Sequence, residues 1–153
     1  MEKKYTDGDM MVDKTFAKKL GIKKNQLIVC LNVNEKILKF IRSQLPSSTK
    51  LKTELDEKDR QDIVITWFKE GDNFYKIFNV LQNTIKSNGA IWGVISKKQV
   101  AKKKGVNLFW GDMIKTALKT NLVDNKVLSF SEEDYGTRFV IRSSTRQLNS
   151  KFG

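Results

Sequence analysis

The densest group of chemically capable side chains in this sequence is a run of lysines. Five of them fall within eight residues with no acid between them: Lys97, Lys98, Lys102, Lys103 and Lys104. Lysine ammonium groups hold phosphates as point charges, and Gly105 behind the run favours a mobile loop. The run therefore predicts a site for nucleic acid or another polyanion, which Arg138 and Arg142 would extend if the final hairpin lies alongside.

The same lysines also fit a charged, solvated surface. The net charge is +12, but the 29 cationic side chains include only five arginines. Arginine is the residue type that base-reading and bidentate phosphate sites prefer. No aromatic residue is interleaved among the five lysines to stack on bases. Polyanion binding therefore stands beside the alternative that the charge only keeps the protein soluble.

The inventory of side chains excludes several familiar active sites. The chain has no histidine and a single cysteine, Cys30, so it holds no serine-histidine triad, cysteine-histidine dyad, zinc cluster or internal disulfide. Cys30 lies in an apolar run and is expected to pack as a small hydrophobe. The acidic loop 132–134 lacks the ligand spacing of a calcium loop, so we predict no metal site. Trp110, beside Phe109, is a candidate contact for a protein partner.

Apolar periodicity predicts alternating strands and helices. We expect strands at residues 27–33, 49–55, 62–68 and 90–95, helices at 34–44, 72–85 and 107–122, and a hairpin of strands 126–130 and 138–142. Asn34 is suited to cap the first helix and Asn107 the third. Asn88-Gly89 supplies a left-handed stop for the second helix.

This order predicts one α/β domain over residues 14–143, with polar tails at 1–13 and 144–153. We expect a Rossmann-like, mainly parallel sheet with helices on its faces and a C-terminal antiparallel hairpin. No apolar stretch approaches the ~20 residues that cross a bilayer, and the N-terminus lacks a signal-peptide pattern. With an unpaired cysteine as well, these features predict a cytoplasmic protein.

Four short stretches make the sequence similar to a small bacterial and archaeal family known only as a domain of unknown function. They are Ala17-Lys18-Lys19-Leu20-Gly21-Ile22-Lys23, Gly89-Ala90-Ile91-Trp92 followed by Lys97-Lys98, Leu122-Val123-Asp124-Asn125-Lys126-Val127, and Arg138-Phe139-Val140. The chain departs from the family pattern at Ser96, where members tend to have proline, and at Tyr135, where they tend to have tryptophan. The resemblance implies a fold, and it brings no catalytic or binding residues with it.

The order of elements also resembles class I methyltransferases, in which a hairpin ends a doubly wound sheet. Their adenosylmethionine needs a glycine-rich turn after the first strand, whereas residues 32–36 of this chain contain no glycine. A carboxylate near the end of the second strand, Glu54 or Asp56, could still meet a ribose. We predict that no cofactor is bound.

Three hypotheses about function follow. The first is a non-enzymatic cytoplasmic binding or interaction module that lacks a cofactor loop, whose partner would be a protein. The second is a nucleic-acid or polyanion binder that uses the lysine-rich segment 97–104. The third is a minimal methyltransferase dependent on adenosylmethionine.

Overall fold

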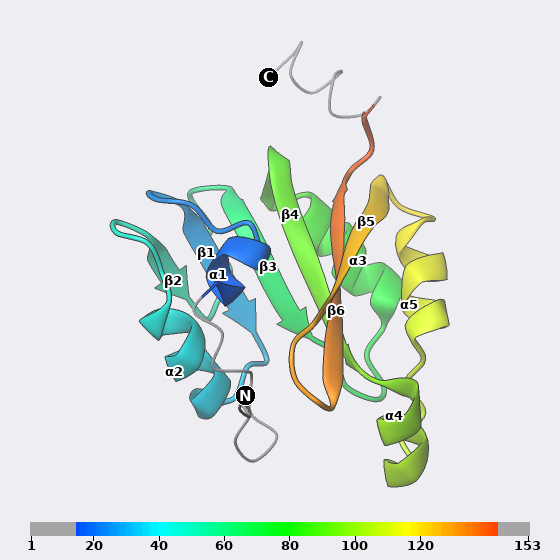
Figure 1. Ribbon diagram of the computed structural model, residues 1–153. Helices are drawn as coiled ribbons and strands as arrows, with labels where there is room; N and C mark the ends of the chain where they lie inside the picture. The colour runs from blue at the N-terminus through cyan, green and yellow to red at the C-terminus, as the bar shows by residue number, and fades with distance from the viewer. Residues whose placement is uncertain (1–14, 144–153) are drawn as a thin grey trace.

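The computed structural model describes residues 15–143, which form one six-stranded sheet flanked by helices (Figure 1). In spatial order the strands are β2 (Lys50–Lys52), β1 (Leu27–Leu31), β3 (Gln61–Trp67), β4 (Ile85–Ser96), β6 (Asp134–Ile141) and β5 (Leu122–Ser129). The first four are parallel, and β6 runs antiparallel to both β4 and β5. The predicted Rossmann-like, mainly parallel sheet with a final hairpin is confirmed. The two predicted tails lie outside the described residues.

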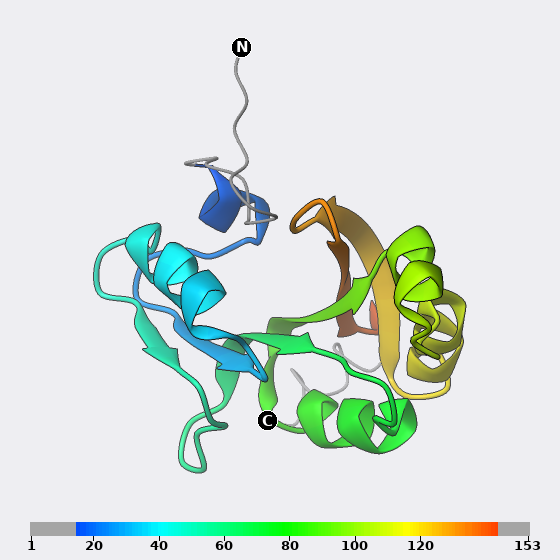
Figure 2. The same cartoon turned by 90° about the horizontal axis from the view of Figure 1, so that it is seen from below.

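Helices cover both faces of this sheet. They are α1 (Phe16–Lys19), α2 (Glu35–Ser43), α3 (Phe74–Gln82), α4 (Lys98–Lys104) and α5 (Trp110–Ala117). Figure 2 shows α1 and α2 on one side of the sheet and α3 and α5 on the other. We name these sides the α1–α2 face and the α3–α5 face. No helix within residues 15–143 is long and apolar enough to cross a membrane.

Unbroken apolar strands create two cores, one on each face. Successive side chains of a strand point to opposite sides, so Ile28 and Cys30 of β1 join the core under α1 and α2, while Val29 joins the other. Trp92 of β4 is fully buried on the α1–α2 face, and its Nε1 donates to the Leu20 carbonyl at 3.0 Å. This double burial explains why the central strands lack polar alternation.

The first helix cap is correct as predicted, and the predicted strand 49–55 is shorter than expected. The Asn34 side chain accepts a hydrogen bond from the Ile37 amide at 2.8 Å. At the start of α3, the Asn73 side chain likewise accepts a hydrogen bond from the Lys76 amide at 3.0 Å. Only residues 50–52 of the second predicted strand pair with β1, and they form β2 at the sheet edge.

The predicted helix 72–85 was wrong at its C-terminal end. The helix α3 ends at Gln82, and Ile85 already pairs with Gln61 as the start of β4. Asn88-Gly89 therefore lies inside a strand. A Cβ on Gly89 would stand 2.9 Å from the Asp62 carbonyl of β3, so the glycine allows the close approach of a neighbouring strand.

The third predicted helix was also too long. The helix α5 begins at Trp110, after Phe109, instead of behind an Asn107 cap. The helix ends at Ala117. Leu122, which was expected to be its last apolar residue, is instead the first residue of β5 and is fully buried. Both strands of the hairpin are accordingly longer than predicted.

The lysine run is a helix, and its prediction as a loop was wrong. Lysine, glutamine and alanine are good helix formers, and Lys98–Lys104 forms α4 with no interruption. Gly105 ends it with φ of 69°, the left-handed conformation that terminates many helices. Gly105 is therefore a helix stop, and it leads into the segment 106–109 that connects α4 to α5.

Candidate functional site

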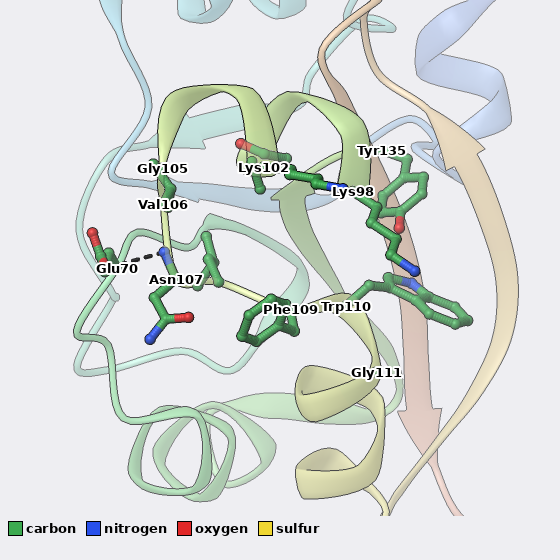
Figure 3. Close-up of a pocket in the computed structure, with 13 residues that line it drawn as sticks. Glu70, Lys98, Lys102, Gly105, Val106, Asn107, Phe109, Trp110, Gly111 and Tyr135 are labelled. Atoms are coloured by element: carbon green, nitrogen blue, oxygen red, sulfur yellow. Dashed lines mark hydrogen bonds between the residues drawn. The ribbon is translucent and has the colours of Figure 1, made fainter.

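A pocket of about 790 Å³ lies at the carboxyl edge of the sheet. It lies beyond the ends of β3 and β4, between α4, α5 and the start of β6 (Figure 3). Ala101, Val106 and Leu108 contribute apolar side chains to its lining. Doubly wound sheets present ligands at this edge, and the volume falls in the range of small-molecule sites.

Three aromatic rings form one side of this pocket. The ring centroids of Trp110 and Tyr135 are 6.1 Å apart, and the Trp110 Nε1 donates to the Thr137 hydroxyl at 2.8 Å. Trp110 is nevertheless 37% exposed and Phe109 51% exposed, which is unusual for side chains of this size. Burial raises the pKa of the Tyr135 hydroxyl. The three rings thus form an aromatic wall that is partly exposed to solvent.

The helix α4 sorts the predicted lysines into separate environments. Lys98 and Lys102 are one turn apart, and both line the pocket, with Lys98 extending toward the Trp110 side (Figure 3). Lys104 forms an ion pair with Glu133 at 3.2 Å, and Lys97 donates to the Ser129 hydroxyl at 3.1 Å. Lys103 is exposed. The run is therefore not one uniform cationic patch.

Acidic side chains near the pocket are engaged in structure. Glu70 accepts a hydrogen bond from the Asn107 amide at 3.0 Å on the rim opposite Lys98 (Figure 3). Burial, together with the neighbouring Glu133, raises the pKa of the Asp134 carboxyl, which hydrogen-bonds Ser96. Across residues 15–143, no group of three cysteines or carboxylates is arranged to hold a metal ion.

The two hairpin arginines do not join α4. Arg142 lies at the opposite edge of the sheet, where its Nη2 donates to the carbonyls of Leu118, Thr120 and Leu122 at 3.3 to 3.4 Å. It thereby satisfies orphan carbonyls behind α5. Arg138 pairs across the sheet with Trp92 and so points to the α1–α2 face. The polyanion surface expected from residues 97–104, Arg138 and Arg142 is thus distributed over three places.

The crevice between β1 and β3 is the topological switch point, where doubly wound folds usually bind cofactors. Asn32 follows β1 with φ of 61°, a conformation that glycine adopts more easily, and its Nδ2 donates to the Trp67 carbonyl at 3.4 Å. At the start of α2, the Ile37 amide already donates its hydrogen bond to the Asn34 side chain and so is not available to a ligand. No residue of 32–34 lines the pocket described above. A side chain thus bridges the place where a glycine-rich loop would admit a ligand.

The acidic residues considered for a ribose contact are also displaced from that crevice. Glu54 is exposed beyond the short strand β2. Asp56 pairs with Lys52 and accepts the amides of Lys58 and Asp59, which together hold the pKa of its carboxyl well below the usual range. Asp56 thus stabilises the turn that follows β2. The residues of the switch point therefore do not fit the ordinary adenosylmethionine site.

Sequence reasoning identifies Trp110 and the lysines, but it misses most of the pocket. In the sequence, Tyr135 is only a departure from a family pattern, Asn107 only a candidate helix cap, and Glu70 carries no signal. The signal available is the pair Phe109-Trp110, two large aromatic residues placed just before a short helix. Periodicity alone does not reveal that they remain exposed.

The chain has a Rossmann-like fold that is similar to the fold of solved methyltransferases. It resembles a methyltransferase from Aquifex aeolicus that depends on adenosylmethionine, with a TM-score of 0.61 and 12% identity over 84% of this chain and 88% of that one. It also resembles the N-methyltransferase NodS from Bradyrhizobium japonicum, with a TM-score of 0.56 and 8% identity over 84% and 94% of the two chains. At these identities the likeness concerns the fold.

The chain belongs to the family described as protein of unknown function DUF3052, whose model matches residues 17–143. This membership agrees with the resemblance seen in the sequence. No curated protein matches the chain by sequence.

Proposed function

We propose that this protein is a small-molecule-binding domain that holds a planar, anionic ligand in the pocket between α4 and α5. The observation that carries the proposal is the exposed aromatic wall of Phe109, Trp110 and Tyr135 facing Lys98 and Lys102 across an apolar cavity. Aromatic walls bind flat rings, and lysine ammonium groups fix a carboxylate, sulfonate or phosphate at one end. The proposed role is binding without catalysis, because the pocket lacks a matched acid–base pair.

A fluorescent planar anion tests this proposal directly. We expect 8-anilinonaphthalene-1-sulfonate to bind the folded protein at one site and to quench Trp110. The variants Lys98→Gln and Lys102→Gln should each weaken binding about threefold or more, whereas the matched variant Lys103→Gln removes the same charge from an exposed position and should leave affinity unchanged. Equal weakening by all three variants, or binding at many sites, would refute a defined pocket.

The second candidate function is methyl transfer from adenosylmethionine. The neighbours in fold are adenosylmethionine-dependent methyltransferases, and this comparison supports the third hypothesis more than the first. One local feature favours it as well: the Trp67 Nε1, at the carboxyl end of β3, is buried with no hydrogen-bond partner among residues 15–143 and could donate to a ligand. The Asn32 bridge argues against it, because its side chain spans the crevice that the cofactor would enter.

Calorimetric titration with adenosylmethionine and with adenosylhomocysteine separates the two candidates. The unfolding temperature provides a second measurement, because a ligand that binds only the folded state raises it. Binding of either compound, abolished by Trp67→Phe but not by Lys98→Gln, would favour the methyltransferase, because phenylalanine lacks the Nε1 donor. If neither compound binds and the protein still binds the naphthalene sulfonate, the pocket between α4 and α5 is favoured as the functional site.

A further inference from the structure

A second cationic cluster lies on the α1–α2 face, away from the pocket. Lys126 of β5 stands directly opposite Arg138 of β6 in the sheet register. Two like charges in this position repel each other, because directly opposite side chains of neighbouring strands are close. The pair is therefore unfavourable unless something negative lies between or above the two groups.

A β-bulge creates this pairing. Asp124 pairs with Phe139 and Lys126 with Arg138, so Asn125 is an extra residue without its own partner. In a regular strand Lys126 would share the face of Asp124, since residues two apart point to the same side. Phe139 belongs to the core of the α3–α5 face, and Asp124, its partner, shares that side by ordinary alternation. The extra residue turns Lys126 to the α1–α2 face, where it stands opposite Arg138 in place of the neutral Asn125.

The helix α1 brings further cations to the same place. Lys18 and Lys19 occupy its last turn, and the Lys126 ammonium donates to the Lys19 carbonyl at 3.0 Å. Together with Gly21, Asn125 and Arg138 these residues surround a hollow of about 260 Å³. Among the residues that the structure describes, its lining contains four cationic side chains and one amide, with no carboxylate. The charge comes from α1 and from the two strands of the final hairpin, more than a hundred residues later in the chain.

The Arg138 side chain has no ion pair and no hydrogen bond within residues 15–143, although it is only partly exposed. Its burial lowers the pKa of the guanidinium group, the direction expected for a cation that has lost water without gaining a counterion. A guanidinium in this state has its donors available to a ligand. The geometry and the charge thus call for the same kind of partner, a compact anion with several acceptor oxygens.

We propose that Arg138, Lys126 and Lys18 form a binding site for the phosphate group of a small phosphorylated solute. A planar guanidinium binds two oxygens of a phosphate at once, and lysines neutralise the remaining charge. The hollow suits a single phosphate or diphosphate better than a nucleic-acid strand, because its cations converge from α1, β5 and β6 on one small space. The site is independent of the pocket between α4 and α5.

The test uses inorganic pyrophosphate and inorganic phosphate as probes, with sodium chloride at matched ionic strength. We expect pyrophosphate to raise the unfolding temperature of the protein by about 2–5 °C beyond chloride. Arg138→Gln and Lys126→Gln should lower the affinity measured by calorimetry at least tenfold, while Lys103→Gln should preserve it within about twofold. An equal effect of chloride, or equal losses in the control variant, would overturn the proposal.

Two further measurements separate binding from a structural role. Without ligand, Arg138→Gln should unfold at the temperature of the parent protein or above it, because it relieves the repulsion. A lower temperature would assign Arg138 a structural role instead. Lys126→Gln is compared by affinity alone, since it also loses the hydrogen bond to the Lys19 carbonyl. Lys126→Arg keeps the charge and should retain binding. A single-stranded DNA of 20 nucleotides, followed by anisotropy, distinguishes the source of the phosphate: tight binding lost equally in Arg138→Gln and Lys103→Gln would replace the solute by nucleic acid.

Discussion

The carboxyl edge of the sheet is built in two different ways. Where β1 and β3 end, the Asn32 side chain bridges the strands. Where β4 ends, α4 and α5 leave a pocket with an exposed aromatic wall. The two regions share one sheet and one edge, and the pocket lies at the second. The usual ligand position of a fold and its open cavity can therefore be separated by a single strand.

Aromatic residues show the same contrast. Phe130 is 1% exposed and makes ring contacts with Phe16, Trp67 and Trp92 at centroid distances of 5.2, 6.0 and 5.8 Å. Phe109 at the pocket is half exposed. The first ring holds the fold together on the α1–α2 face, and the second has little to stabilise, which makes it available for binding.

The largest expected effect comes from removing these two rings. Phe130→Ala should reduce the free energy of unfolding by about 3–5 kcal/mol, because it leaves a cavity among three aromatic side chains. Phe109→Ala should cost less than about 1 kcal/mol but weaken binding of the naphthalene sulfonate. Urea unfolding followed by circular dichroism measures both. Similar losses of stability in the two variants would contradict the contrast between the packed core around Phe130 and the open pocket at Phe109.

Cys30, in the core of the α1–α2 face, should make the stability of the protein depend on pH. Burial raises the pKa of the Cys30 thiol to about 12 from its ordinary value of 9.0, with Arg42 acting weakly in the other direction. The unfolded state therefore releases this proton first, and stability falls as pH rises from about 9 toward 12, by at most ~1.4 kcal/mol per pH unit. Urea unfolding of Cys30→Val, compared with the parent at pH 8 and pH 10.5, should show a shallower loss. Identical pH profiles would mean that the thiol has the same pKa in the folded and the unfolded protein.

Two glycines at the pocket should respond to alanine with opposite signs. Gly105 has φ of 69°, and Gly111 lies within α5; an added Cβ would meet nothing within 4 Å at either position. Gly105→Ala should therefore cost about 1–2 kcal/mol through backbone strain alone. Gly111→Ala should gain up to about 1 kcal/mol, since alanine favours the helix. Thermal unfolding of both variants measures the two effects, and a stabilising Gly105→Ala would disprove the left-handed end of α4.

The smallest effect is expected for the ion pair between Lys104 and Glu133. Both side chains are about half exposed, and a pair of this kind contributes no more than ~0.5 kcal/mol. Lys104→Gln and Lys103→Gln should therefore have nearly the same unfolding temperature at 0.15 M salt. A difference of several degrees would show that this contact fixes α4 at the rim of the pocket.

Local signals predict much of the fold but little of the pocket. The run 27–33 and the Asn34 cap are predicted correctly because strand burial and capping depend on neighbouring residues. The ends of α3 and α5 are misplaced because Ile85 and Leu122 fit a helical stripe and a buried strand equally well. Only pairing with other strands decides between the two, and that information is not local.

The sequence by itself determined the class of fold, the double burial of the central strands, the absence of histidine chemistry and the total charge. Tertiary structure alone decided where that charge acts. It placed Lys98 and Lys102 at an aromatic pocket, Arg142 behind α5, and Arg138 opposite Lys126 through one extra residue in β5. The physical reason is that a charged or aromatic side chain obtains its role from the groups packed around it. In this protein those groups come from segments that lie up to about a hundred residues apart along the chain, as in the contact of Lys126 with Lys19.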